Sequence, residues 1–271
     1  MIRSDAEDMQ TPPETALAAL EGVELDDLRL TPTSSRFETK FVAPSGALGA
    51  LLDVCGKAAY RVLRIDGAPV QRYHTTYYDT ADLAFYHAHH GGRAARAKVR
   101  VRRYEATGDQ FVEVKQRQNS GRTLKFRAPC AGEAANPVAA SRHLPAEARR
   151  LVERTAPRAV LYMVFDRITL VSQTGDERVT VDLRMTAGTE DRRIALDGPI
   201  FVEAKQYRPR IPIFHRNMPA PRLREQPASK YCVAVALLYP THKHNSFKPL
   251  LRRLDALRAS ESFTPAPAHL R

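Results

Sequence analysis

The chain has 271 residues and carries 42 Lys and Arg against 30 Asp and Glu, a formal net charge of +12 at pH 7. This length suits one large β-rich domain or two smaller ones. No apolar run approaches the roughly 18 residues that a membrane-spanning helix needs, and the acidic N-terminal stretch lacks the apolar segment of a secretory signal. The cysteines are odd in number, widely separated and without CxxC spacing, which excludes a disulfide framework and a zinc site: Cys55, Cys130 and Cys232. We therefore expect a cytoplasmic protein with reduced thiols.

The charge is distributed unevenly along the chain. Residues 1–30 hold two bases and eight acids, a net charge of −6, and the remaining 40 bases and 22 acids give a net charge of +18. So basic a body attracts polyanions, whether nucleic acid, nucleotide, polyphosphate or an anionic membrane. We predict that residues 1–33 form a disordered acidic leader in front of the folded part.

Strand patterns and helix patterns alternate along the rest of the chain. Runs with apolar residues at every second position predict strands at 36–43, 72–78, 94–104, two further strands that complete a meander to residue 128, and then 159–172, 177–185 and 200–207. Apolar residues at helical spacing, most of them after Pro or Ser, predict helices at 15–20, 44–55, 145–155, 229–238 and 246–260.

One histidine cluster, His87-Ala88-His89-His90, invites interpretation as a metal site. No carboxylate or cysteine lies beside it at ligand spacing, and metal sites need several convergent ligands. We therefore interpret this segment as a solvated hairpin loop.

Six strand-like stretches place charged residues at every second position and apolar residues between them. Because strand side chains alternate between faces, each stretch has one charged and one apolar face. The charged faces hold 12 Lys or Arg, four Asp or Glu and two Thr: Arg36, Glu38, Lys40, Lys98, Arg100, Arg102, Glu113, Lys115, Arg117, Thr123, Lys125, Arg127, Arg178, Thr180, Asp182, Arg184, Glu203 and Lys205. A single such stretch often only faces solvent. Six with the same positive excess would repel one another, which favours a surface that binds a polyanion together with a metal ion.

The expected strands number eight, are mostly hairpin-linked and have helices inserted between them, which indicates an α+β fold. Eight strands suit a closed barrel whose interior holds side chains or one ligand. We predict an eight-stranded, mostly antiparallel β-barrel with a charged interior, flanked by helices that cover its apolar outer face. This domain spans residues 34–240, and residues 241–271 form a C-terminal amphipathic helix and tail.

Eight short motifs then occur in a family-specific order. They are Arg36-Phe37-Glu38-Thr39-Lys40, Tyr78-Asp79-Thr80, Arg100-Val101-Arg102-Arg103-Tyr104, Glu113-Val114-Lys115, Phe165-Asp166-Arg167, Arg178-Val179-Thr180-Val181-Asp182, Glu203-Ala204-Lys205 and Ser229-Lys230-Tyr231. In this order they resemble the VTC-type polyphosphate polymerase domain of the triphosphate tunnel metalloenzyme (CYTH-like) superfamily, over residues 34–240. Arg36 stands where that pattern has an acid, and Phe165 stands in place of a tyrosine.

The resemblance implies a tunnel enzyme that moves the γ-phosphoryl group of ATP onto inorganic polyphosphate with Mn²⁺ or Mg²⁺. The phosphate-gripping catalytic residues implied are Lys40, Arg100, Arg102, Lys115, Arg167 and Arg178. Further substrate contacts are expected from Arg117, Lys125, Arg127, Lys205, Ser229 and Lys230, and metal ligands from Glu203, Glu38 and Glu113. Family members in larger assemblies feed a membrane channel, so the resemblance also suggests a separate membrane-protein partner.

Several alternatives stay open from the residues themselves. Water as acceptor would make the same tunnel a tripolyphosphatase or nucleoside triphosphatase, and a site without catalysis would be a polyphosphate- or nucleotide-binding module. Glu113 is either a metal ligand or a charge partner of the bases, and for Asp182 we favour the second role. We expect no nucleic-acid partner, because aromatic residues do not interleave with the bases as stacking platforms would.

Overall fold

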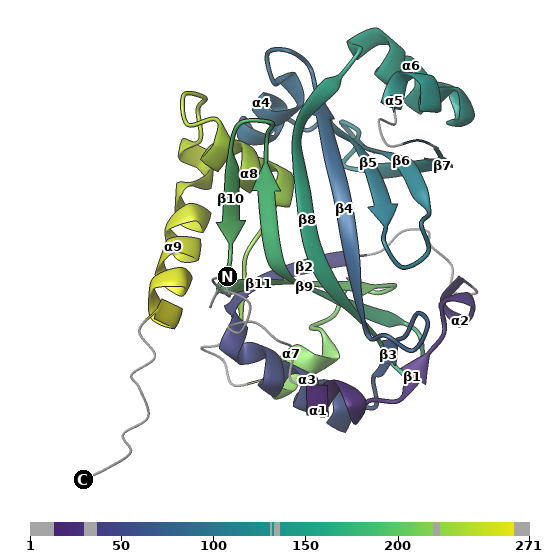
Figure 1. Cartoon of the computed structure of the whole chain (residues 1–271), viewed down its shortest axis with the longest axis vertical. Helices are drawn as coiled ribbons and strands as arrows, with labels where there is room; N and C mark the ends of the chain where they lie inside the picture. The colour runs from purple at the N-terminus through teal and green to yellow at the C-terminus, as the bar shows by residue number, and fades with distance from the viewer. Residues whose placement is uncertain (1–13, 30–36, 131, 133–135, 219–222, 263–271) are drawn as a thin grey trace, which may run out of the picture.

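The computed structural model of the chain describes residues 14–29, 37–130, 132, 136–218 and 223–262. Its strands belong to one sheet with the helices packed around it (Figure 1). None of the described helices is both long enough and apolar enough to cross a membrane.

The strands are β1 (Gly22–Val23), β2 (Phe37–Pro44), β3 (Arg61–Leu63), β4 (Val70–Asp79), β5 (Arg96–Tyr104), β6 (Gln110–Arg117), β7 (Thr123–Pro129), β8 (Arg158–Val171), β9 (Glu177–Gly188), β10 (Arg193–Leu196), β11 (Pro199–Gln206) and β12 (Arg224–Glu225). The α-helices are α1 (Glu14–Ala18), α2 (Leu25–Arg29), α3 (Leu48–Lys57), α4 (Ala84–His90), α5 (Pro137–Ala140), α6 (Ala146–Thr155), α7 (Ile213–Asn217), α8 (Lys230–Leu238) and α9 (Lys248–Ser262). Short 3₁₀ helices lie at Ser45–Ala47, Ser141–His143 and Asn245–Phe247.

Eight strands form the body of the sheet in the order β2-β11-β9-β8-β4-β5-β6-β7, and the two-residue strand β12 extends it beyond β2. Every neighbouring pair along this path is antiparallel. These are the eight strands predicted from the sequence, and the mixed α+β class is confirmed.

Closure of these strands into a barrel is not seen in the described residues, which corrects the prediction. The ends of the path, β2 and β7, share no main-chain pairing there, and β2 instead pairs with β12 at Phe41 and Val42. Side chains bridge the ends, because Lys115 and Lys125 reach Glu38 on β2. Paired strands lie roughly 4.8 Å apart, and long charged side chains can bridge a wider gap. The sheet therefore curls far enough for these side chains to meet, but the described residues of β2 and β7 stay too far apart to pair.

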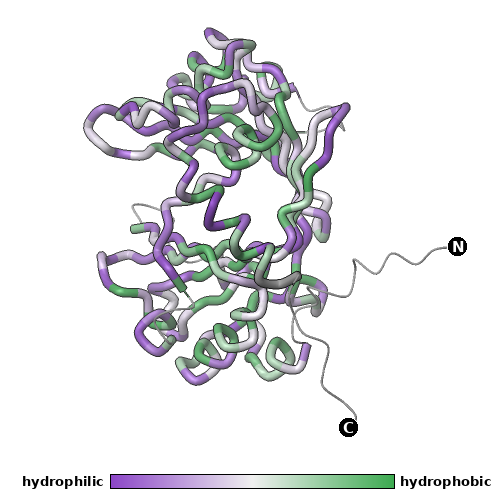
Figure 2. Tube along the Cα trace, turned by 90° about the vertical axis from the view of Figure 1, so that its left-hand side faces the viewer, coloured by the Kyte–Doolittle hydropathy of each residue, from purple (hydrophilic) through white to green (hydrophobic). Residues whose placement is uncertain are grey.

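Helices bury most of the apolar strand faces. Figure 2, which colours the chain by hydropathy, shows hydrophilic and hydrophobic residues alternating along it. The apolar side of β2, β9 and β11 packs against α1, α3 and α7, with Phe41 and Leu51 fully buried. The apolar side of β5 and β6 packs against α5 and α6, where Val99 meets the cluster that contains Val152. Each such side chain contributes about 1.5–3 kcal/mol on burial. The opposite, charged face is thereby turned inward.

Helix α8 limits how far the charged interior extends. It is apolar on nearly all sides, as expected for a helix surrounded by protein. It packs with α9 and with apolar residues on the inner face of the sheet, among them Phe201 and Met185. Its apolar body therefore fills one end of the interior and leaves its first turn beside the charged residues.

Arg184 was expected on the charged inner face and does not lie there. The β8–β9 register shifts between Val164 and Asp166, and Arg184 has a φ of +48°. A β-bulge of this kind re-aims the side chain that follows it. Arg184 instead donates to Asp166 at 2.6 Å, on the face where Asp166 also binds Arg72.

Part of the N-terminal segment that we predicted to be disordered is folded. Residues 14–29 form α1, β1 and α2, in which Leu17 and Val23 are buried, and β1 pairs in parallel with β3. The apolar residues between the acids supply core contacts that composition alone did not reveal. The helix predicted at 15–20 is confirmed by α1, whereas the prediction of a disordered leader is wrong for residues 14–29. Residues 1–13 and 30–33 lie outside the described residues.

The histidine cluster at residues 87–90 lies on helix α4, so the predicted hairpin loop is wrong. The carboxylate of Asp79 accepts hydrogen bonds from the backbone N–H groups of Phe85 and Tyr86. A carboxylate at this position stabilises the start of a helix. Of the cluster's residues, His87 contacts His242, with 3.1 Å between the Nε2 of His87 and the Nδ1 of His242.

Candidate active site

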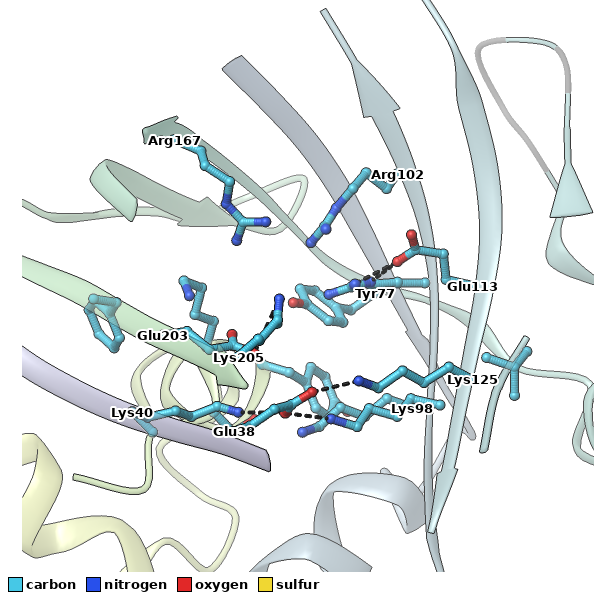
Figure 3. A pocket seen from close by; sticks show the side chains of 18 of the residues that line it. Glu38, Lys40, Tyr77, Lys98, Arg102, Glu113, Lys125, Arg167, Glu203 and Lys205 are labelled. Carbon is cyan, nitrogen blue, oxygen red and sulfur yellow. Dashed lines mark hydrogen bonds and ion pairs between the residues drawn. The ribbon is translucent and has the colours of Figure 1, made fainter. Parts of the chain in front are cut away.

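Charged residues of the inner sheet face surround a cavity of about 350 Å³ (Figure 3). Its lining contains ten cationic side chains and three carboxylates, an excess of seven positive charges: Lys40, Lys98, Arg100, Arg102, Lys115, Lys125, Arg127, Arg167, Lys205 and Lys230, with Glu38, Glu113 and Glu203. The volume lies within the usual range of small-molecule sites, roughly 300–1,000 Å³. This cavity is the candidate active site.

Thirteen of the fifteen predicted site residues line this cavity. The other two, Arg117 and Arg178, lie on the same sheet face but outside the lining. Arg117 is opposite Arg96, and Arg178 is opposite Lys205. Strand alternation predicts the face of a residue, but it does not predict where along the strand a cavity ends.

Glu38 on β2 connects the two ends of the sheet. Its carboxylate accepts from the Nζ atoms of Lys125 at 2.5 Å, Lys115 at 3.2 Å and Lys40 at 3.5 Å. Burial and nearby Glu203 favour the protonated form of Glu38, but the three ammonium groups outweigh them and lower its pKa to about 2. Lys115 and Lys125 lie directly opposite each other and would otherwise repel. Glu38 offsets that repulsion.

Arg100 and Glu113 form a second charged pair across β5 and β6. They are opposite each other in register, and the Nε of Arg100 donates to Glu113 at 2.6 Å. Burial acts to raise the pKa of Glu113, but Arg100 and Arg102 outweigh it and lower that pKa to about 2. In the described structure Glu113 therefore pairs with a base, which is one of the two roles that the sequence left open for it.

Asp182 on β9 holds one cation from the sheet and one from a helix. Its buried carboxylate accepts from the Nε of Arg167 at 2.5 Å and from the Nη2 at 2.8 Å, and it pairs with the Nζ of Lys230 at 2.6 Å. Burial disfavours its charge, but Arg167 and Lys230 hold its pKa well below the usual range. Asp182 therefore fixes the positions of both cations at the cavity wall.

The first turn of α8 reaches the cavity through Ser229 and Lys230. The Ser229 hydroxyl caps the helix by accepting from the backbone N–H of Cys232 at 3.3 Å. The sequence predicted a phosphate contact for Ser229, and in the described structure its oxygen is engaged by the cap. A helix N-terminus nevertheless favours a nearby anion through its free N–H groups and its dipole.

Lys98 lines the cavity although we did not include it among the predicted site residues. It lies opposite Lys115, but while Lys115 pairs with Glu38, Lys98 forms no ion pair with a described carboxylate. Burial, together with Lys115 and other nearby cations, lowers the pKa of Lys98 to about 8. Its alternation with Arg100 and Arg102 was the signal that could have identified it.

This depressed pKa predicts proton-linked anion binding. A bound anion favours the charged ammonium group, so above pH 8, where the Lys98 amine of the free protein is largely neutral, binding must take up a proton. Affinity for inorganic tripolyphosphate should therefore fall as pH rises through 8, by up to about tenfold per unit. Lys98→Arg, which stays charged, should fall less. Affinity is measured by calorimetric titration of both proteins at each pH, because the ligand's own protonation affects both equally and drops out of the difference between them. Equal pH slopes for wild type and Lys98→Arg would mean that Lys98 is not the group that takes up the proton.

Two of the three predicted metal ligands lie on paired strands. Glu38 on β2 and Glu203 on β11 are diagonal neighbours, because Glu203 is opposite Lys40 in register. Burial acts to raise the pKa of Glu203, but Lys205 and Lys40 hold it well below the usual range. Mg²⁺ is typically held by one or two carboxylates plus substrate phosphates and water, so this ionised pair fits such an ion.

No group of three His, Cys, Asp or Glu side chains within the described ranges is placed to hold a metal by itself. Phosphate oxygens would therefore have to complete any coordination sphere at Glu38 and Glu203. Glu113 lies on another strand and is held by Arg100.

Comparisons with known proteins agree with the motif order. A family profile described as the VTC domain matches residues 35–239. A proposed adenylate cyclase from Vibrio parahaemolyticus is 12% identical, with 88% of this chain and 95% of that chain covered and a TM-score of 0.39. A proposed adenylyl cyclase from Hippeastrum, described as having a dominant triphosphatase activity, is 16% identical, with 75% and 97% covered and a TM-score of 0.48. These structural similarities are too weak to assign an activity. No curated protein matches the sequence.

Proposed function

The chain belongs to the VTC domain family, and we propose that its cavity is the active site of a metal-dependent polyphosphate polymerase. The enzyme would transfer the γ-phosphoryl group of ATP to a growing chain of inorganic polyphosphate. The excess of seven positive charges around one cavity carries this proposal. A ligand that offsets so many cations in so small a space must itself carry several closely spaced negative charges, as a phosphate chain does.

Phosphoryl transfer depends mainly on positioning the reactants and on neutralising charge at the phosphate oxygens. The guanidinium groups of Arg100, Arg102 and Arg127 offer paired donors to non-bridging oxygens, and the lysines act as compact positive charges. A terminal oxygen of the polyphosphate attacks the γ-phosphorus in line. The bond from that phosphorus to the bridging oxygen breaks, and ADP leaves. No side chain needs to form a covalent intermediate.

Glu203 and Glu38 are the carboxylates that would hold Mn²⁺ or Mg²⁺, which would neutralise charge on the phosphate oxygens. Both are ionised at neutral pH, since nearby lysines keep their pKa values low. Their lysine partners would then be free to contact phosphate. The cavity can therefore exchange its internal ion pairs for contacts with the substrate.

The test is incubation of the purified full chain with ATP and Mn²⁺, followed by a gel stained for polyphosphate and an assay for free phosphate. A ladder of long chains is the expected result. Free phosphate without a ladder would replace the polymerase with a triphosphatase that uses water as the acceptor. Neither product, despite tripolyphosphate binding, would leave a binding module and overturn the proposed activity.

Lys115→Ala should weaken tripolyphosphate binding by about 1.5–3 kcal/mol, the usual cost of losing a charged hydrogen-bond partner. Lys115 lines the cavity between Lys98 and Lys125, which lie opposite it on the neighbouring strands. Its ammonium group is available to phosphate once Glu38 releases it. Arg103→Ala, on the exposed opposite face of the neighbouring strand β5, is the matched control. Calorimetry that shows equal affinity in both variants would mean that this charged face does not bind the ligand.

A further inference from the structure

Tyr73 on β4 and Phe165 on β8 form a pair of parallel rings beside the cavity. They are directly opposite each other in the antiparallel register. Their ring planes differ by 3° and their centroids are 5.4 Å apart. Both side chains are buried. Such a pair can serve simply as core packing, so the groups that touch it decide its role.

Two guanidinium groups contact this ring pair. The guanidinium carbon of Arg102 is 5.4 Å from the Tyr73 centroid and 5.7 Å from the Phe165 centroid. The corresponding distances for Arg167 are 5.0 and 5.3 Å. All four are within the roughly 6 Å over which a cation is attracted to a ring face. Figure 3 shows Arg102 and Arg167 extending into the same cavity from different strands.

The two arginines differ in what else stabilises them. Arg167 has the carboxylate of Asp182. Arg102 is 6% exposed, donates from its Nε to the Thr75 hydroxyl at 3.2 Å, and forms no ion pair with any carboxylate that the structure describes. Burial and the neighbouring Arg100 lower its pKa. A buried charge without an ion-pair partner is costly. Nearby Glu113 offsets part of that cost at longer range, and the ring faces are in direct contact with the guanidinium group and stabilise its charge further.

A ring face stabilises a guanidinium without accepting its N–H groups, whereas a carboxylate occupies two of them. We propose that Tyr73 and Phe165 are positioning residues, which hold Arg102 and Arg167 in the cavity by cation–π contacts and leave the donors of Arg102 for phosphate oxygens. The choice of phosphate as the ligand rests on the proposed function. The cation–π role also explains why phenylalanine suffices at position 165, because the ring face makes the contact and a hydroxyl group is not needed.

The test replaces Phe165 with mono-, di- and trifluorinated phenylalanines in the full chain. Fluorine withdraws electrons from the ring face and weakens cation–π attraction, while the size of the ring changes little. Dissociation constants for inorganic tripolyphosphate should rise stepwise along the series, by on the order of tenfold for the trifluorinated ring. The same series at Phe214, which is buried and does not line the cavity, is the control and should stay flat.

A role in packing alone would give no graded trend at Phe165, and a flat series with normal wild-type binding would overturn the inference. Wild-type protein that binds no tripolyphosphate would instead contradict the proposed function. In that event the melting temperature of the ligand-free protein still tests whether Phe165 stabilises the arginines by cation–π contact. It should fall stepwise for Phe165 relative to Phe214, and parallel behaviour of the two series would refute the cation–π role.

Discussion

Glu203→Gln should abolish metal-dependent turnover and leave the binding of long polyphosphate intact or slightly tighter. The substitution keeps the shape of the side chain but removes the negative charge that would hold the ion beside Glu38. A divalent ion on phosphate oxygens stabilises the transition state more than the ground state, so its loss falls on turnover. Several kcal/mol of such stabilisation correspond to a rate loss of about a hundredfold or more.

Activity with Mn²⁺ and affinity for polyphosphate should both be measured on this variant. Glu153→Gln on α6, whose side chain is exposed outside the sheet, is the matched control and should behave like wild type. Normal turnover in Glu203→Gln would show that Glu203 does not hold the ion, which would leave Glu38 and Glu113 as the candidate ligands. A parallel loss of polyphosphate affinity would instead indicate that Glu203 orders the cavity, since it pairs with Lys205 at 3.3 Å.

The strands and their charged faces could be predicted because both depend on local sequence. Alternation at every second residue places Lys98, Arg100 and Arg102 on one face whatever the rest of the chain does. The same rule failed at Arg184, where a bulge with a positive φ angle turns the side chain away. A bulge depends on the register of the partner strand, and a single strand's pattern carries no sign of it.

The pairing inside the cavity could not be predicted, because it joins residues far apart in the chain. Glu38 meets Lys115 and Lys125 at sequence separations of 77 and 87 residues. Only the curvature of the sheet brings them within reach. The contact of Phe165 with Arg102 is of the same kind. Alternation placed each residue on a face, but the distances between strands that are not adjacent along the chain come from the assembled fold.

Asp182→Asn should lower the free energy of unfolding by about 3–5 kcal/mol in the absence of a polyanion. It removes the one buried carboxylate that accepts from both Arg167 and Lys230, and stranding buried cations is costly. A loss of this size is a large part of the roughly 5–15 kcal/mol that stabilises a typical domain. Urea unfolding monitored by circular dichroism measures it.

A phosphate chain in the cavity should then substitute for the missing carboxylate. Tripolyphosphate should raise the melting temperature of Asp182→Asn by more than it raises that of wild type, because the ligand now neutralises two otherwise unpaired cations. Asp166→Asn is the matched control: Asp166 is also buried and pairs with two cations, but its partners Arg72 and Arg184 lie outside the cavity lining, whereas Arg167 and Lys230 are part of it. That variant should lose stability without gaining extra rescue. Equal rescue in both would mean that the anion acts through general screening of positive charge. Rescue confined to Asp182→Asn would tie the ligand to the cavity wall that Arg167 and Lys230 form.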